Sequence, residues 1–401
     1  MIKNKLIHKL KFPKTSIYIL VVILLIVAFV LGLNFGNGNL TLGGTNATGL
    51  PAHLNYSSVN QVYNLIRDNY DGHLTATQML NGLKEGLANA TGDPYTEYFT
   101  AAQAQSFNSE LNNSFSGIGA ELSATSNGEI EIIAPIAGSP AAKAGLLPKD
   151  IIAGINGKST SGMSVETAVN LIRGPSGSKV TLNILRNNQP LTISITRANI
   201  VVPSVNSKIL NGNIGYIQIT SFASNTASLA NSVAESFVKD HVKGIILDLR
   251  NNPGGYLSAA ISVSSLWLKQ NQTILVEKKG NTIIQTYYAT GNDILHNIPT
   301  VVLINGGSAS SSEITTGALH DNKQAYVIGT QSFGKGVVQQ LINLSNGAEL
   351  KVTVASWYRP DGQDINKKGI TPDKVVNLTQ AEINQGNDTQ LNAALAYLSS
   401  K

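Results

Sequence analysis

The chain has 401 residues, and its 42% hydrophobic and 13% charged residues are ordinary for a folded protein of two or three domains. It contains no cysteine, which excludes disulfide bonds, thiol catalysis and thiolate metal sites. The formal charge of +5 comes from five lysines before residue 15, because removing them from the 29 basic residues leaves 24, equal to the 24 acidic residues. The basic balance therefore does not indicate a nucleic-acid partner.

Residues 17–33 form an uncharged apolar run of 17 residues, close to the shortest helix that spans a bilayer. The basic segment 1–16 favours a cytoplasmic N-terminus by the positive-inside rule. We expect a single-pass signal anchor in the cell membrane, of bacterial type, with everything after Asn34 extracytoplasmic. A signal peptide that is removed is the alternative. Residues 34–53, rich in Gly, Asn and Thr, are expected to be a flexible spacer.

Residues 54–103 are predicted to be a helical region. Apolar side chains recur at helical spacing in two runs, Val59 to Ile66 and Met79 to Leu87, separated by a break at Asp71-Gly72. Gly92-Asp93-Pro94 ends the second run. We expect a helical hairpin packed on neighbouring elements.

Residues 104–198 predict a smaller, β-rich module with helices. Glu129–Ile132 alternates with the period of a strand, and Asp150–Gly157 has the pattern of a strand closed by an Asn-Gly turn. Ser164 is placed to cap a helix whose apolar residues stand at i, i+3, i+4 and i+7. The helix ends at Arg173-Gly174-Pro175.

With Gly138-Ser139-Pro140 between its strands, this order of elements resembles a PDZ domain. The resemblance implies that the C-terminus of a partner peptide adds as a strand beside the helix, while backbone N–H groups of a glycine-rich loop hold its carboxylate. Gly117, Ile118 and Gly119 fit that loop. A β-bulge or tight turn is the alternative for these three residues.

Residues 199–379 predict a larger α/β domain. Gly244–Arg250 is a buried strand by its continuous apolar run, and a Gly-Gly turn and a helix at 257–267 follow it. The same strand, glycine turn and helix recur from Val301, so the core resembles the repeated βα units of ClpP/crotonase-type proteins. An amphipathic helix within residues 380–401 closes the chain. The predicted fold class is a multidomain α/β protein preceded by a transmembrane helix.

A candidate reactive centre lies between Val301 and Leu341. Ser310 stands in a cluster of small residues where a strand gives way to a helix, which exposes a hydroxyl beside unpaired N–H groups and the positive end of a helix dipole. Lys335 lies between two glycines, with Gln339 on the same strand face. A lysine base needs its pKa lowered from about 10.4, and burial can lower it by roughly 3 units. Taken singly, a capping serine and a solvated turn lysine are the alternatives.

The ordered set Gly-Ser-Ala-Ser-x-Ser-Glu and Phe-Gly-Lys-Gly-x-Val-Gln resembles the carboxy-terminal processing peptidases, also called tail-specific proteases. The resemblance extends from about Asn55 to the C-terminus. It implies that Ser310 is the nucleophile, Lys335 the general base and Gln339 the residue that orients the amine.

The same resemblance extends to the Asp-Leu-Arg-x-Asn-x-Gly-Gly segment. It implies an oxyanion hole built from the backbone N–H of Gly254 or Gly255 together with that of Ser311, the alternative being glycines that only permit a tight crossover. The Ile-Arg-Gly segment at Arg173 is similar to one that couples the PDZ module to the active site in some family members. A cation that satisfies the last carbonyls of its helix is the alternative for Arg173.

These patterns predict a membrane-anchored serine endopeptidase that recognises C-terminal tails of exported proteins and needs no metal or cofactor. The chain is compatible with a homo-oligomer, and nucleic acid is not expected as a partner. A catalytically inactive PDZ scaffold is the alternative function. A Ser-His-Asp site would require His320 and Asp321, but His320 lies ten residues after Ser310 in the same predicted helix, about 15 Å along its axis. We therefore predict that His320 is not catalytic.

Overall fold

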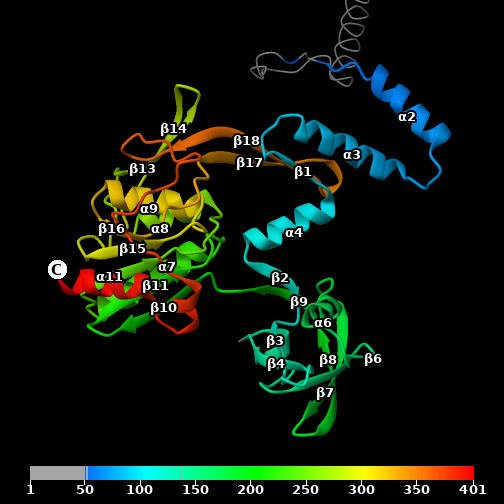
Figure 1. Cartoon of the computed structure of the whole chain (residues 1–401), viewed down its shortest axis with the longest axis horizontal. Helices are drawn as coiled ribbons and strands as arrows, with labels where there is room; N and C mark the ends of the chain where they lie inside the picture. The colour runs from blue at the N-terminus through cyan, green and yellow to red at the C-terminus, as the bar shows by residue number, and fades with distance from the viewer. Residues whose placement is uncertain (1–49, 51–52, 137) are drawn as a thin grey trace, which may run out of the picture. The chain divides into compact units, whose positions relative to one another are not determined.

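The computed structural model describes residues 50, 53–136 and 138–401, and the chain divides into two compact units, residues 1–74 and 75–401 (Figure 1). The described part of the first unit contains helix α2 (Ser57–Asn69), which has the predicted helical pattern and no buried residue. The predicted transmembrane segment 17–33 and nearly all of the predicted spacer lie outside the described residues. Within the described part of the chain, no helix is both long enough and apolar enough to cross a bilayer.

The second unit begins with helix α3 (Ala76–Asn89), capped reciprocally by Thr75 and Gln78. It continues with strand β1 (Glu97–Phe99) and helix α4 (Ala101–Leu111). The expectation of an entirely helical region over residues 54–103 is therefore wrong at β1. This strand forms because it pairs antiparallel with β18 (Glu349–Tyr358), a partner about 250 positions away that no local pattern reveals.

The smaller module is built on one antiparallel sheet in the order β3-β4-β5-β7-β8, with β6 beside β5. Its strands are β3 (Ala120–Ala124), β4 (Ile130–Pro135), β5 (Ile151–Ile155), β6 (Lys158–Ser159), β7 (Lys179–Arg186) and β8 (Gln189–Thr196). Helices α5 (Pro140–Lys143) and α6 (Val165–Ile172) accompany the sheet, and strand β2 (Ser114–Gly117) pairs with β9 (Ala198–Val201). The side chain of Ser164 caps α6, as predicted. Buried Ile, Leu and Val side chains of the strands pack against α6 and form the core of this module.

The larger module contains a six-stranded sheet in the order β10-β11-β12-β15-β16-β19, parallel from β11 onward. Its strands are β10 (Val205–Leu210), β11 (Ile214–Ile219), β12 (Gly244–Asp248), β15 (Thr300–Ile304), β16 (Ala325–Gly329) and β19 (Lys374–Val375). The helices are α7 (Thr226–Lys239), α8 (Leu257–Ser264), α9 (Ser311–Asp321), the short α10 (Gln380–Asn384) and α11 (Thr389–Ser399).

The six-stranded sheet is buried on both faces, which explains the continuous apolar runs of its central strands. On one face, strand residues such as Leu247 and Val302 pack with α7, α8 and α9. On the other face, the alternate residues, such as Ile246 and Val301, pack with Leu398 of α11. The predicted repetition of strand, turn and helix is confirmed, and it brings the carboxyl ends of neighbouring strands to one edge.

A second sheet joins distant segments in the order β1-β18-β13-β14, with β17 paired to β18. Its remaining strands are β13 (Thr273–Lys279), β14 (Thr282–Tyr288) and β17 (Val337–Asn343).

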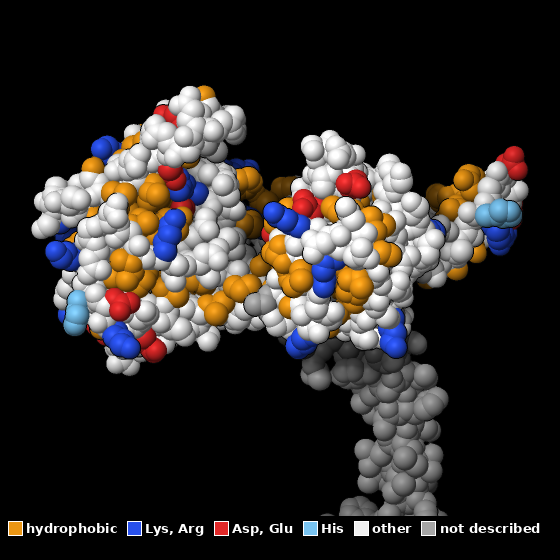
Figure 2. Space-filling model, turned by 90° about the horizontal axis from the view of Figure 1, so that it is seen from below, with side chains coloured by type: hydrophobic (Ala, Val, Ile, Leu, Met, Phe, Trp, Pro, Cys, Tyr) orange, Lys and Arg blue, Asp and Glu red, His pale blue; other side chains and the backbone are white. Residues whose placement is uncertain are grey.

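On the molecular face drawn in Figure 2, basic and acidic side chains are interspersed. That face therefore carries no strong field of a single sign.

Candidate active site

Three loops that follow adjacent parallel strands form the candidate site. β12 ends at Asp248, β15 at Ile304 and β16 at Gly329, and these strands are direct neighbours in the sheet. Because the carboxyl ends of parallel strands meet at one edge, the Gly-Gly turn, the serine cluster and the lysine loop come together there. Motifs that are up to about 80 positions apart in the sequence thus share one site.

Ser310 immediately precedes helix α9 with φ 53° and ψ −114°. A positive φ is strained for a residue with a side chain and persists only where the surroundings impose it. The constraint comes from the loop after β12: the Ala309 N–H donates to the carbonyl of Asn252 at 3.0 Å, and the Ser312 hydroxyl donates to the same carbonyl at 2.9 Å. Hydrogen bonds from Ala309 and Ser312, on either side of Ser310, therefore hold the nucleophile candidate in a sharp turn.

Gly254 and Gly255 both occupy backbone conformations that favour glycine, with φ of 101° and 142°. A Cβ on Gly254 would lie 2.8 Å from the Cβ of Ser310, and one on Gly255 would lie 2.3 Å from the carbonyl oxygen of Phe222. The Gly-Gly turn therefore does more than permit a tight crossover, because it lets the backbone lie directly against Ser310.

The hydrogen bonds of this turn distinguish its two glycines. The Gly254 N–H donates to the Oδ1 atom of Asn252 at 2.9 Å, so it already has an acceptor. The Gly255 carbonyl accepts from the Ser311 hydroxyl at 3.0 Å. Among the described residues, the N–H groups of Gly255 and Ser311 have no acceptor. Unpaired N–H groups, one of them at a helix N-terminus, suit the stabilisation of a developing oxyanion.

Lys335 is partly buried in the loop between β16 and β17. Burial lowers the pKa of its amine, and the positive charge of Lys351 lowers it further, while Glu97 and Asp93 act in the opposite direction. The Nζ atom lies 5.2 Å from the centre of the Tyr95 ring. The environment thus shifts the amine toward its neutral form, which is the form that accepts a proton.

Gln339 of β17 lines the same cavity as Lys335, which precedes that strand. Its Nε2 atom donates to the carbonyl of Tyr95 at 2.6 Å, and no hydrogen bond to Lys335 is present among the described residues. Gln339 therefore fixes the backbone of the residue whose ring covers the lysine, and does not itself bind the amine in this structure.

Glu313 is a residue whose role the sequence interpretation missed. Its carboxylate is buried, with 1% of the residue exposed, and accepts four hydrogen bonds. One oxygen accepts from the N–H groups of Ser310 and Lys335, both at 2.9 Å. The other accepts from the Gly334 N–H at 2.7 Å and the Ser332 hydroxyl at 2.6 Å. This carboxylate links the nucleophile loop to the lysine loop, and its position three residues after a helix-capping serine was the available sequence signal.

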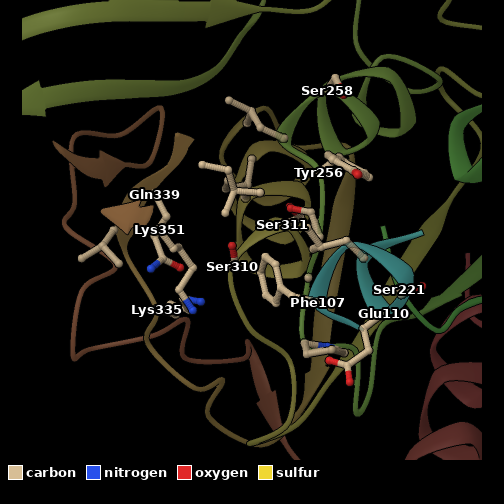
Figure 3. A pocket seen from close by; sticks show the side chains of 18 of the residues that line it. Phe107, Glu110, Ser221, Tyr256, Ser258, Ser310, Ser311, Lys335, Gln339 and Lys351 are labelled. Carbon is tan, nitrogen blue, oxygen red and sulfur yellow. The ribbon is translucent and has the colours of Figure 1, made fainter. Parts of the chain in front are cut away.

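A cavity of about 580 Å³ opens onto these groups. Figure 3 shows the Ser310 hydroxyl between the side chains of Lys335 and Phe107, with Ser311 beside it. Most of the wall is apolar, and Lys335, Gln339 and Lys351 stand together on one side of it in Figure 3. The cavity is larger than one side chain and matches several residues of an extended peptide.

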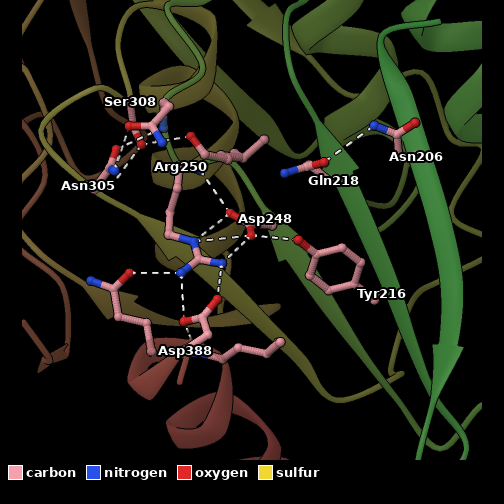
Figure 4. Close-up of polar contacts among 12 residues, drawn as sticks. Asn206, Tyr216, Gln218, Asp248, Arg250, Asn305, Ser308 and Asp388 are labelled. Carbon is pink, nitrogen blue, oxygen red and sulfur yellow. Dashed lines mark hydrogen bonds and ion pairs between the residues drawn. The ribbon is translucent and has the colours of Figure 1, made fainter. Parts of the chain in front are cut away.

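An ion-pair network joins the loop after β12 to the start of the C-terminal helix α11 (Figure 4). The Arg250 guanidinium donates to Asp248 and to Asp388, at 2.6 and 2.8 Å for its Nη2 atom. Burial opposes ionisation, yet the two carboxylates raise the pKa of Arg250, and Arg250 in turn holds the pKa of Asp388 below its usual range. Asp388 caps α11, so the network fixes the chain leading into the Gly-Gly turn against the C-terminal helix.

Comparison with known proteins decides the family. The sequence model of peptidase family S41 matches residues 213–376, and that of the PDZ domain matches residues 108–185. The chain is 39% identical over 366 residues to the carboxy-terminal processing protease CtpA of Bacillus subtilis (strain 168), covering 89% of this chain and 76% of that protein. It is 35% identical over 376 residues to a probable CtpA-like serine protease of Staphylococcus aureus (strain MRSA252), with 93% and 74% covered.

The chain belongs to the carboxy-terminal processing proteases of peptidase family S41. It is therefore a serine-type peptidase with a PDZ domain, and the predicted family is confirmed. A solved structure of a putative S41 protease from Bacteroides fragilis has the same fold, with a TM-score of 0.53 at 18% identity, covering 88% of this chain and 99% of that one.

The glycine-rich segment of the PDZ domain starts at Gly117, the last residue of β2, and ends at Gly119, just before β3. The carbonyls of its residues are engaged within the domain: Ile118 accepts from the Ala141 N–H at 2.8 Å, and Gly119 accepts from the Ile136 N–H and the Ser139 hydroxyl, both at 2.9 Å. Gly119 has φ 76°, and a Cβ there would lie 2.5 Å from that of Ser139. Because its carbonyls point into the domain, the loop Gly117–Gly119 is held in a fixed conformation.

Arg173 ends helix α6, but the last carbonyls of that helix are bound by a different arginine. The buried Arg197 donates from Nε to the Ile172 carbonyl at 2.6 Å and from Nη2 to the Leu171 carbonyl at 3.2 Å. The exposed Arg173 guanidinium instead lies 5.2 Å from the centre of the Phe115 ring. The helix-end alternative for Arg173 is therefore wrong, and this arginine is left available for other contacts.

His320 lies near the far end of α9 and does not line the cavity of Ser310. One ring nitrogen contacts Asp321 at 2.9 Å and the other contacts Asp373 at 3.1 Å. The bond to Asp321 and the proximity of Asp373 raise the pKa of His320. His320 thus joins α9 to the chain before β19, and within the described residues no cluster of three or more His, Asp or Glu side chains is arranged to hold a metal ion.

Proposed function

We propose that this protein is an endopeptidase that uses Ser310 as nucleophile and Lys335 as general base. The observation that carries the proposal is a single cavity that contains the Ser310 hydroxyl, a lysine with a lowered pKa and two N–H groups without an internal acceptor. These are the parts that acyl transfer requires: a nucleophile, a base and an oxyanion site.

The proposed reaction begins when the neutral amine of Lys335 accepts the hydroxyl proton as Ser310 attacks the scissile carbonyl. The N–H groups of Gly255 and Ser311 stabilise the negative oxygen of the tetrahedral intermediate. Lys335 then donates its proton to the departing amine, which leaves an acyl group on Ser310. A water molecule, deprotonated by the same lysine, hydrolyses the acyl-enzyme and restores both groups.

Gly255 is the better candidate for the first oxyanion donor, since the N–H of Gly254 is already bound to the side chain of Asn252. The second donor, Ser311, is the first residue of α9, where the helix dipole adds to the stabilisation of negative charge. A side chain on Gly255 would collide with Phe222 and displace the N–H.

The PDZ domain is proposed to bind the C-terminal tail of a protein substrate as an added strand along β3, with its carboxylate at Gly117–Gly119. The fixed conformation of this loop and the flanking position of α6 support that use. The apolar segment 17–33 and the basic segment before it support a membrane anchor with the catalytic domain outside the cytoplasm. Exported proteins with accessible tails are therefore the proposed substrates.

The alternative of an inactive PDZ scaffold is less well supported, because the cavity contains every group that the reaction needs. Cleavage of an unstructured protein such as β-casein by the full-length chain tests the choice. We expect fragments from the wild type and none from Ser310→Ala, with both proteins equally stable to heat. Equal fragment patterns from the two proteins would contradict the proposal.

A further inference from the structure

One wall of the active-site cavity comes from helix α4, outside the segment that matches peptidase family S41. Phe107 and Leu111 of α4 line the cavity together with Ser310 and Lys335. The family matches begin at residue 108 for the PDZ domain and at residue 213 for the protease, so Phe107 lies in neither. Phe107, which neither match includes, thus contributes directly to the active site from a helix whose last residues belong to the PDZ match.

Phe107 is a fixed part of this wall. Its ring stacks on that of Phe99, with centroids 5.0 Å apart and an angle of 26° between the planes. The Nζ atom of Lys351 lies 5.1 Å from both ring centres. One residue further along α4, Asn108 donates to Glu349 of β18 at 2.7 Å. These contacts hold the ring by packing and hydrogen bonding, as a selective wall requires.

The position of Phe107 relative to the proposed base indicates which part of a substrate it would meet. In Figure 3, Phe107 and Lys335 lie on opposite sides of Ser310. The departing amine must reach Lys335 to be protonated, so the C-terminal part of a cleaved peptide lies on the lysine side. The residue that supplies the scissile carbonyl therefore lies on the Phe107 side.

We infer that Phe107 is a specificity-determining residue, which limits the size of the side chain carried by the residue whose carbonyl is attacked. This inference rests on the proposed function. Leu111, Tyr256 and Ile314 give this part of the cavity an apolar surface, to which Glu110 and Ser221 add polar groups, so an apolar side chain of modest size is accepted. The phenylalanine ring closes the end of that space and excludes bulky aromatic side chains.

The test uses full-length protein and peptides that span the main cleavage site in β-casein. The peptides differ only at the residue that supplies the scissile carbonyl, which is Ala, Leu, Phe or Trp. In Phe107→Ala we expect the ratio of kcat/KM for the Trp peptide to that for the Ala peptide to rise about tenfold, the scale on which pocket size discriminates side chains. In Phe107→Trp we expect the Leu peptide to lose rate relative to the Ala peptide.

Gln105→Ala is the matched control, because Gln105 lies on the same helix α4 but is exposed and does not line the cavity. Its ratios should stay those of the wild type. An equal change for all four peptides in Phe107→Ala, or a changed preference at the residue after the scissile bond instead, would overturn the inference. Cleavage of these peptides by Ser310→Ala at the wild-type rate would overturn the proposed function as well. The two failures are therefore distinguishable.

Discussion

The substitution Glu313→Gln tests how the structure holds the nucleophile and the base in register. The carboxylate accepts two hydrogen bonds on each oxygen, two of them from the N–H groups of Ser310 and Lys335. A glutamine keeps one acceptor oxygen and turns an NH₂ group toward two donors, so two hydrogen bonds are lost. At about 1.5–3 kcal/mol for each bond to a charged group, the loss is roughly 3–6 kcal/mol.

Part of that energy appears in the reaction barrier, because whichever oxygen is replaced, the lost hydrogen bonds belong to the loops that carry the nucleophile and the base. With about 1.4 kcal/mol for each factor of ten, about 3 kcal/mol appearing wholly in the barrier would lower kcat about 100-fold, and half of it roughly tenfold, so we expect a loss of roughly 10- to 100-fold. Initial rates on the β-casein peptide and thermal unfolding of the same preparation measure both consequences.

Glu382→Gln is the matched control for this measurement. Glu382 also accepts from a residue three positions earlier, Thr379, at 2.7 and 2.8 Å, but on one oxygen, at the surface and away from the cavity. We expect its kcat to equal that of the wild type. If Glu313→Gln kept both the wild-type kcat and the wild-type melting temperature, the bridging role would be refuted.

Four further outcomes follow from the same structure. Lys335→Ala and Lys335→Arg should both abolish cleavage while the protein stays folded, since alanine has no base and guanidinium stays charged; turnover of either variant at pH 8 would contradict this. In the wild type, kcat/KM should rise with pH as Lys335 loses its proton, and Lys351→Met should move that rise to higher pH, because it removes a charge that lowers the pKa of Lys335; an unchanged profile would refute the coupling. His320→Ala should keep the wild-type kcat but lose more thermal stability at pH 5 than at pH 8. The folded state raises the pKa of His320, so the protonated imidazole stabilises the fold below the unfolded pKa of about 6.5. This contribution disappears as the pH rises through the folded pKa. Arg173→Ala should leave the melting temperature nearly unchanged and slow the cleavage only of substrates that use the PDZ domain. Arg197→Ala should lower the melting temperature, because Arg197 binds the last carbonyls of α6. The reverse pattern would show that Arg173 stabilises the end of this helix.

The parts of the fold that could be predicted from the sequence are those with a local signal. The continuous apolar strands β12 and β15 predict a sheet buried on both faces, and the capping Ser164 predicts the start of α6. The serine and lysine motifs likewise stand in loops whose strands are adjacent, so their meeting follows once the strand order is known.

The parts that could not be predicted depend on distant partners. β1 is a strand only because β18 pairs with it, and α4 has a weak apolar pattern in which Ala104 alone is buried. Its contribution to the cavity was therefore invisible. The orienting role expected of Gln339 stays a prediction; in this structure its amide binds the carbonyl of Tyr95, 244 positions earlier in the chain, a partner that no local pattern reveals. The helix-end role considered for Arg173 belongs to Arg197, which lies between β8 and β9 and reaches α6 through a tertiary contact.

The central claim is that Ser310 is a nucleophile activated by a neutral Lys335. The most direct measurement is the site of covalent labelling by a fluorophosphonate probe, found by mass spectrometry of the digested full-length protein. The account predicts an adduct on Ser310 in the wild type and its loss in Lys335→Ala. An adduct on a different serine, or equal labelling of Ser310 without the lysine, would contradict it.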